Sequence, residues 1–242
     1  MKVTGFILFL IFPLNLFAQV GTKQVTIESA DKFLLKARYY SSGKAGPGIL
    51  LLHQCDRRGP LTGYEQLAET LAREGFNVLV PDSRGFGESK NERYQDFHSQ
   101  MSLIEPKVPQ DIEALYTFLS SRKEVDQPKI GLAGASCGVR QAIRLAVNRP
   151  EIRTLVFISG AYSVTGPIAE DYNKLTNVPV LSMYSEQDRF GTPAAMRDSF
   201  ERSRNEYSKL LIYKGNRHGT PLFAQDVNLE QQILRWFVTH LR

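Results

Sequence analysis

Ser136 has the setting of a reactive hydroxyl, because it lies at the centre of the pentapeptide GASCG, residues 134–138. A short apolar run, residues 130–135, precedes it, and a helical pattern begins at Cys137. A side chain at a sharp strand-to-helix turn is pushed out of the packed layers, and the crowded backbone requires small neighbours. The first N–H groups of the helix favour negative charge that develops above the serine. The spacing predicts a nucleophile elbow, and an ordinary glycine turn is the alternative.

A serine hydroxyl needs a base to take its proton, and the base needs a carboxylate to orient it. Asp188 stands just past the apolar run of residues 178–184, and His218 lies on the loop beyond the last such run. The order Ser136, Asp188, His218 is the one expected when the elbow comes first. We therefore predict these three as catalytic residues. Glu186 is the alternative carboxylate, and roles as a helix cap and a turn residue are the alternatives for Asp188 and His218.

The elements that must position these residues are short strands alternating with helices. Two strand-like runs parted by a short turn predict an antiparallel hairpin at the start. The later apolar runs alternate with helical patterns, which predicts a mostly parallel sheet with helices on both faces. The predicted strands are residues 24–29, 33–40, 48–52, 77–81, 130–135, 154–159, 178–184 and 209–213. Residues 90–108 are polar and fit no element. We predict one α/β domain over residues 22–242, with an eight-stranded sheet.

In these motifs the chain resembles the α/β-hydrolases, and most of all their dienelactone-hydrolase-like and small serine esterase members. The matching segments are GASCG, the loop DSRGFGES at residues 82–89, the strand end at Asp188 and the loop at His218. The resemblance covers about residues 22–242 and implies the α/β-hydrolase fold. It implies hydrolysis of a small-molecule carboxylic ester through an acyl-enzyme, without metal or organic cofactor. A lactone hydrolase of the dienelactone type, a thioesterase, a peptidase and an inactive hydrolase-like binding protein are the alternatives.

The family holds the reacting oxyanion with two backbone N–H groups. By resemblance these belong to Cys137, after the nucleophile, and to Cys55, in the loop after an early strand. Gln54 stands there in place of the usual glycine and is the alternative donor. On this alignment the two cysteines flank one small pocket. We expect both to be reduced and to serve as packing residues, and a disulfide between them is the alternative.

Substrate contacts are predicted from residue types near the strand ends. An arginine there could receive a substrate carboxylate through a forked pair of hydrogen bonds, and surface ion pairs are the alternative. The arginines concerned are Arg57, Arg58, Arg84, Arg140 and Arg189, and we single out Arg57, Arg140 and Gln54 as candidate substrate-binding residues. The connection of residues 160–177 is too short for a cap of several helices, which predicts an open cleft with no large cap domain.

The N-terminus predicts export. Lys2 precedes an apolar run over residues 5–12, and Ala18 is a small residue before a cleavage point, which is typical of a cleaved secretory signal over residues 1–18. We expect a periplasmic or secreted protein without stable membrane insertion, and an uncleaved anchor is the alternative. The net charge of +5 is spread along the chain without a basic cluster, which argues against nucleic-acid binding.

Overall fold

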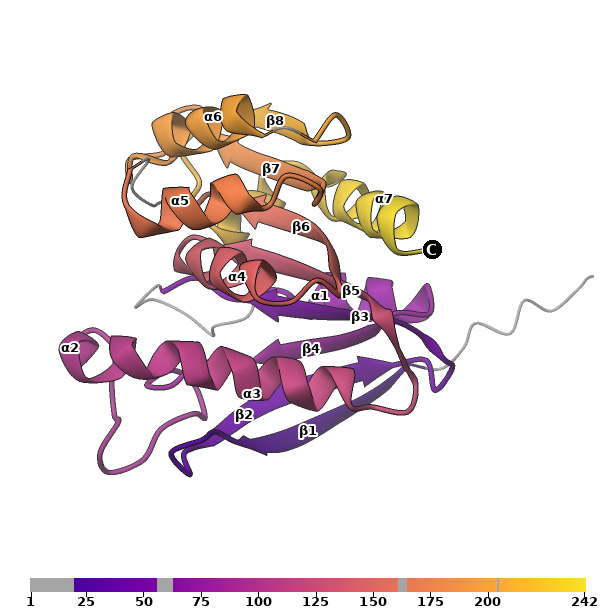
Figure 1. Ribbon diagram of the computed structural model, residues 1–242, viewed down its shortest axis with the longest axis vertical. Helices are drawn as coiled ribbons and strands as arrows, with labels where there is room; N and C mark the ends of the chain where they lie inside the picture. The colour runs from indigo at the N-terminus through magenta and orange to yellow at the C-terminus, as the bar shows by residue number, and fades with distance from the viewer. Residues whose placement is uncertain (1–19, 56–62, 161–164, 204) are drawn as a thin grey trace, which may run out of the picture.

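The computed structural model describes residues 20–55, 63–160, 165–203 and 205–242. Their strands form one eight-stranded sheet in the order β1-β2-β4-β3-β5-β6-β7-β8 (Figure 1). β1 pairs antiparallel with β2, β2 pairs antiparallel with β4, and the other neighbouring pairs are parallel. This confirms the predicted fold class. The strands are β1 (Gly21–Glu28), β2 (Leu34–Ser41), β3 (Gly46–Leu52), β4 (Asn77–Pro81), β5 (Val125–Ala135), β6 (Ile152–Ile158), β7 (Val180–Ser185) and β8 (Lys209–Tyr213).

Helices cover both faces of this sheet (Figure 1). One face packs against α1 (Glu65–Arg73) and α7 (Leu229–Leu241). The other packs against α3 (Val108–Ser120), α4 (Cys137–Val147), α5 (Pro167–Lys174) and α6 (Thr192–Arg202). A short helix α2 (Met101–Ile104) and a 3-10 turn η1 (Glu105–Lys107) lead into α3, and η2 (Thr220–Ala224) precedes α7.

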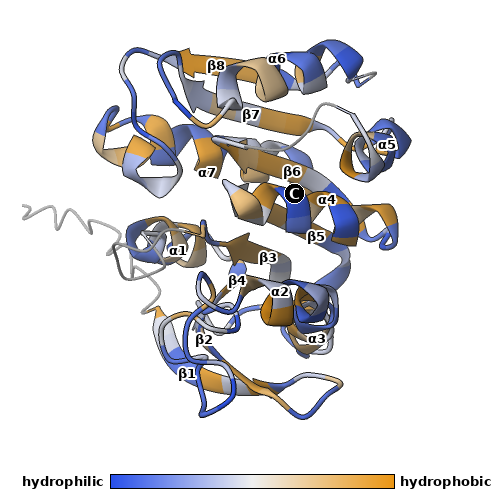
Figure 2. Cartoon of the chain, turned by 90° about the vertical axis from the view of Figure 1, so that its left-hand side faces the viewer, coloured by the Kyte–Doolittle hydropathy of each residue, from blue (hydrophilic) through white to orange (hydrophobic). Residues whose placement is uncertain are grey.

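The central strands are apolar throughout because both of their faces are covered. In β3, Leu50 and Leu52 point to the side of α3 and α4, whereas Ile49 and Leu51 point to the side of α1 and α7. This alternation follows from the two-residue period of a strand. Figure 2 shows the apolar colouring concentrated in the strands and in the helix faces turned toward them.

Two segments differ from the sequence-based expectation. Residues 90–108, which fit no predicted element, form turns, α2 and η1 before α3 begins at Val108. α3 has Pro109 in its first turn, where proline is tolerated because the N–H that it lacks would have no partner within the helix. β5 begins at Val125, five residues before the predicted start, since its first half is polar and lacks the apolar signal.

The loop DSRGFGES is anchored by a buried arginine. The guanidinium of Arg84 bonds to both carboxylate oxygens of Asp111, at 2.6 and 2.9 Å, and to both of Asp31, at 2.7 and 2.9 Å. Its central carbon, Cζ, also lies 4.2 Å from the ring centre of Phe33 and 4.6 Å from that of Tyr94. The hydrogen bond from Arg84 lowers the pKa of Asp31. Arg84 thus joins the hairpin turn, the loop after β4 and α3, and it is closed to a substrate carboxylate.

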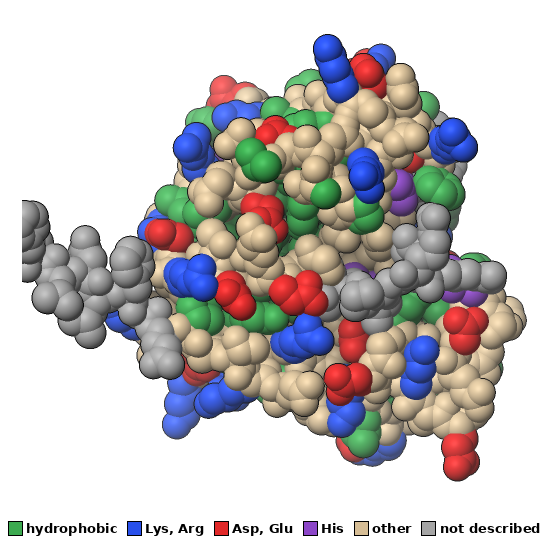
Figure 3. Space-filling model, turned by 180° about the vertical axis from the view of Figure 1, so that it is seen from behind, with side chains coloured by type: hydrophobic (Ala, Val, Ile, Leu, Met, Phe, Trp, Pro, Cys, Tyr) green, Lys and Arg blue, Asp and Glu red, His purple; other side chains and the backbone are tan. Residues whose placement is uncertain are grey.

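The predicted signal over residues 1–18 lies outside the described residues. Within those residues, no helix combines the length and the hydropathy that crossing a membrane requires. On the face drawn in Figure 3, acidic and basic side chains are interspersed and do not form a patch of one sign.

Candidate active site

Ser136 occupies a strained turn between β5 and α4. Its backbone angles are φ 52° and ψ −116°, a region that L-residues rarely adopt, and its N–H donates to the Ile158 carbonyl at 2.9 Å. A Cβ at Gly134 would overlap the Gly138 backbone, and a Cβ at Gly138 would overlap the Leu52 carbonyl. The two glycines therefore let α4 approach the ends of β3 and β5 closely, which pushes the serine hydroxyl out of the layers.

The structure brings Ser136, Asp188 and His218 into contact. His218 follows β8, and its Nε2 lies 2.7 Å from the Ser136 hydroxyl oxygen. Its Nδ1 lies 2.7 Å from Oδ2 of Asp188, whose side chain is buried just past β7. A carboxylate only accepts, so Nδ1 carries the ring proton and Nε2 can accept the proton of the serine. The alternative carboxylate, Glu186, is exposed to solvent.

Gln54 supports the histidine loop. Its side-chain oxygen accepts a hydrogen bond from the Thr220 N–H at 2.7 Å, and Gln54 is only 8% exposed. Gly219, between Thr220 and His218, has φ +69°, and a Cβ there would overlap the amide of Gln54. The side-chain oxygen of Gln54, which was predicted to bind substrate, is therefore engaged in holding the histidine loop. Its amide takes the space beside the histidine loop that the usual glycine would leave open.

His53 is a functional neighbour that sequence reasoning did not single out. Its Nε2 accepts the N–H of Ser83 at 2.9 Å, so Nδ1 carries the proton and donates to the carbonyl of Gln54 at 2.6 Å. Burial lowers the pKa of His53, which keeps the ring neutral. The ring joins the loop after β3 to the loop after β4. The available sequence signal was a histidine placed directly after a buried strand.

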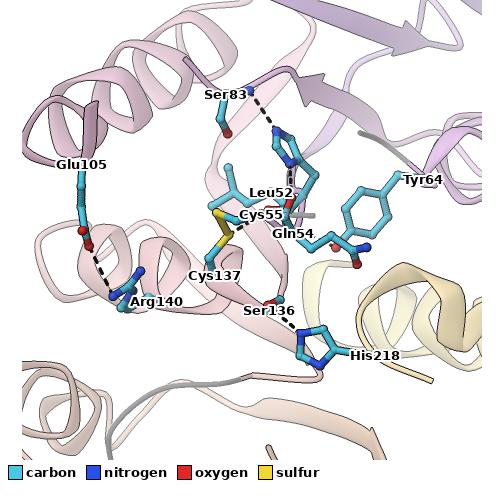
Figure 4. Close-up of a disulfide and its surroundings, with 11 residues drawn as sticks. Leu52, Gln54, Cys55, Tyr64, Ser83, Glu105, Ser136, Cys137, Arg140 and His218 are labelled. Atoms are coloured by element: carbon cyan, nitrogen blue, oxygen red, sulfur yellow. Dashed lines mark hydrogen bonds and ion pairs between the residues drawn. A yellow bond between two sulfur atoms is a disulfide. The ribbon is translucent and has the colours of Figure 1, made fainter. Parts of the chain in front are cut away.

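Cys55 and Cys137 form a disulfide, with their Cα atoms 5.8 Å apart (Figure 4). The expectation that both cysteines are reduced is therefore wrong. The reason lies in the pairing of β3 with β5, in which Leu52 stands opposite Gly134. Cys55 lies three residues beyond Leu52, and Cys137 lies three residues beyond Gly134. The two segments therefore leave the sheet side by side. The resemblance already placed the two cysteines at one pocket, but the register that brings their side chains within bonding distance cannot be read from the sequence alone.

The remaining candidate contacts lie elsewhere or are already engaged. Arg57 is outside the described residues. Arg140, on the first turn of α4, pairs with Glu105 at 3.4 Å. Figure 4 shows this pair across the disulfide from Ser136 and His218. Arg140 lines a small pocket there with Phe86, Phe97, Val108 and other residues. The structure therefore does not direct Arg140 to the serine.

Phe190 is a rim residue that the sequence did not reveal. It is 65% exposed, and its ring centre lies 4.5 Å from that of His218. Its backbone N–H donates to Oδ1 of Asp188 at 3.2 Å, which fixes the second carboxylate oxygen. No periodic pattern marks an exposed aromatic residue on a loop. The site therefore has an apolar ring beside the imidazole, open to solvent.

Solved structures of other proteins share the architecture of this chain. The dienelactone hydrolase from Anabaena variabilis superposes with a TM-score of 0.73 at 20% identity, covering 93% of this chain and 100% of its own. The esterase Pf2001 from Pyrococcus furiosus gives a TM-score of 0.73 at 18% identity, covering 92% of this chain and 93% of its own. At such identities the likeness concerns the fold alone. That fold is the α/β-hydrolase fold.

The family follows from the sequence. The model of the dienelactone hydrolase family matches residues 35–229, and the chain belongs to that family. Among curated proteins, the acyltransferase drtE of Aspergillus calidoustus is 27% identical over 147 residues, which are 59% of this chain and 44% of that protein. The chain spans less than half the length of that relative, so the likeness does not carry over its activity.

Proposed function

We propose that the protein is a serine hydrolase that cleaves carboxylic esters through an acyl-enzyme. The observation that supports this most is the continuous line of hydrogen bonds from Ser136 through His218 to Asp188, at 2.7 Å each. Membership of a hydrolase family supports the same reaction class. A hydroxyl at a strained elbow, an imidazole and a buried carboxylate form the arrangement that activates a serine.

In the proposed reaction, the Ser136 oxygen attacks the acyl carbon while Nε2 of His218 takes the hydroxyl proton. The carboxylate of Asp188 stabilises the imidazolium that forms. Backbone N–H groups of Cys137 and Cys55 donate to the oxyanion. The tetrahedral intermediate collapses when His218 returns the proton to the leaving alkoxide, which leaves an acyl-Ser136 ester. Water then attacks with His218 as base, and Ser136 departs as the acid product is released. These steps use the protein and water, without a metal or cofactor.

A lactone is the second candidate substrate. The family to which the chain belongs is named for lactone hydrolysis, and a lactone is an internal ester that reacts at the same carbonyl. Its alcohol stays attached to the acyl group after ring opening, so one product is formed instead of two. Thioesters and peptides remain further alternatives of the same chemistry. Comparing kcat/KM across matched esters, lactones and thioesters ranks these substrates directly.

A fluorophosphonate probe distinguishes the hydrolase from an inactive binding protein. The probe phosphorus reacts with an activated serine, and we expect stoichiometric labelling that peptide mass spectrometry maps to Ser136. Heat-denatured protein is the control, because it retains the serine but loses the hydrogen bonds at 2.7 Å that activate it. Absence of labelling in the folded protein would contradict the proposal and favour the binding protein.

We also propose that the mature protein is exported. Lys2 followed by an apolar run supports a secretory signal, and a disulfide is typical of oxidising compartments. When the full chain is expressed in a bacterium with a periplasm, fractionation should find it outside the cytoplasm. N-terminal sequencing should then begin near Gln19. Retention of an intact N-terminus in the cytoplasm would contradict export.

A further inference from the structure

The fold fixes the positions of the two proposed oxyanion donors to different degrees. Cys137 begins α4, and the close packing at Gly134 and Gly138 fixes that turn against the sheet. Its N–H is in the first turn, where no carbonyl of the helix can accept it. Cys55 follows β3 on a loop, outside any helix or strand. The position of the Cys55 N–H therefore depends on side chains more than on secondary structure.

One restraint orients the peptide that carries this N–H. Nδ1 of His53 donates to the carbonyl of Gln54, which belongs to the same peptide unit as the Cys55 N–H. In a trans peptide the N–H points away from the carbonyl. The ring of His53 is bonded to Ser83, and in Figure 4 Ser83 and Ser136 lie on opposite sides of the disulfide. The Cys55 N–H is thereby turned away from the ring of His53.

The disulfide supplies the second restraint, on position. It joins the residues of both donors covalently and holds their Cα atoms 5.8 Å apart. The hydrogen bond from Thr220 to Gln54 acts on the same loop from the side of His218. Among these contacts the disulfide is the one that links the first donor directly to the second. The disulfide therefore restrains the distance between two N–H groups that must both donate to one oxygen.

We propose that the Cys55–Cys137 disulfide is a positioning element of the oxyanion hole, so that the reduced protein stays folded but stabilises the transition state less well. The proposal rests on the serine hydrolase function proposed above. Oxyanion donors act mainly on the charge that develops during reaction, so their misplacement lowers kcat and leaves KM nearly unchanged. Complete loss of one donor typically costs about 10²–10³ in rate. A donor that is loosened and not removed should cost about tenfold.

The experiment compares the oxidised protein, the protein reduced by a trialkylphosphine, and the double variant Cys55→Ala/Cys137→Ala. The phosphine gives two electrons to the disulfide and takes oxygen from water, which yields a phosphine oxide and two thiols. These are the only two cysteines in the chain, so the variant must be insensitive to the reductant and serves as its control. Both substituted residues keep their backbone N–H. Thermal unfolding of each form establishes that it is folded at the assay temperature.

We expect reduction and double substitution each to lower kcat for p-nitrophenyl acetate about tenfold, with KM within twofold. Reoxidation should restore kcat in the wild-type protein only. A trifluoromethyl ketone, which forms an oxyanion on Ser136, should bind about tenfold more weakly to both altered forms, as their kcat falls. A neutral amide that resembles the substrate should bind all forms equally. A purely structural disulfide would shift the unfolding temperature and leave the ketone affinity unchanged.

Three results would overturn the proposal. If titration of the unfolded, unreduced protein found two free thiols, the disulfide would not exist. Equal kcat and equal ketone affinity in oxidised and reduced protein would show that the disulfide does not position the oxyanion donors. Labelling of Ser136 by the fluorophosphonate would still support the hydrolase function in that case. An oxidised protein that neither labels nor hydrolyses esters would overturn both proposals together. If the double variant fails to fold, the reduced wild-type protein still decides the question.

Discussion

Replacing Ser136 with alanine should lower kcat for short p-nitrophenyl esters by about 10⁴- to 10⁶-fold. The hydroxyl is the atom that attacks, and its hydrogen bond to His218 is the contact that activates it. Alanine removes both and leaves the backbone N–H groups at the elbow in place. Steady-state hydrolysis, followed at the absorbance of p-nitrophenolate, measures the loss. The residual rate then reports what the oxyanion donors and binding contribute without a nucleophile.

A matched serine-to-alanine change controls for general effects. Ser121 directly follows α3 on the surface, where its hydroxyl donates to the Phe118 carbonyl. Ser121→Ala should hydrolyse esters at the wild-type rate. The far-ultraviolet circular dichroism of both variants should match that of the wild type, because each substitution removes only a hydroxyl group and adds no atom that could clash. A folded Ser136→Ala protein that retains substantial activity would refute the assignment of the nucleophile.

Asp188→Asn should lower kcat by about 10³- to 10⁴-fold. The asparagine amide can keep the contact with the Phe190 N–H through its oxygen, so the loop is retained. Its NH₂ group then faces Nδ1 of His218 and donates to it, which moves the ring proton to Nε2. In that tautomer the ring cannot accept the proton of Ser136. The variant therefore tests proton transfer with little change of shape, and its kcat and its labelling rate by fluorophosphonate should fall together.

Glu186→Gln is the control for this variant. The glutamate lies two residues earlier on the same loop, is exposed, and is the alternative carboxylate that the sequence offered. It should retain kcat within about twofold, as surface substitutions usually do. The reverse outcome, a large loss at Glu186 and none at Asp188, would transfer the role of the carboxylate to Glu186.

The sequence sufficed for the fold because the central strands are apolar on both faces and the helices carry one apolar stripe. Runs such as residues 77–81 and 209–213 match their strands β4 and β8 from end to end. The contact of Ser136, Asp188 and His218 was also predictable, since parallel strands bring their carboxyl ends to one edge. The catalytic roles of these residues await the variants described above.

Other features depend on which strands are neighbours. The hydrogen bond between Gln54 and Thr220 joins residues 166 positions apart, and neither residue type predicts it. The same is true of His53, whose ring partners come from its own loop and from the loop after β4. The disulfide required knowledge that β3 pairs with β5 and in which register. Local sequence patterns predict single helices and strands. These contacts depend on how the helices and strands are arranged in space.

The register that brings the two sulfurs together also sets the length of the loop after β3. A single inserted residue lengthens an extended segment by about 3.3 Å, and cysteines whose Cα atoms are more than about 7 Å apart cannot be bridged without backbone movement. With the present Cα separation of 5.8 Å, an insertion between Leu52 and Cys55 moves the half-cystine out of reach unless the chain rearranges. Relatives that keep this cross-link are therefore expected to keep the segment between β3 and its cysteine at this length, whereas relatives without it can vary that segment. The turn from β5 into α4 keeps its length in both cases, because the close packing at Gly134 and Gly138 fixes it.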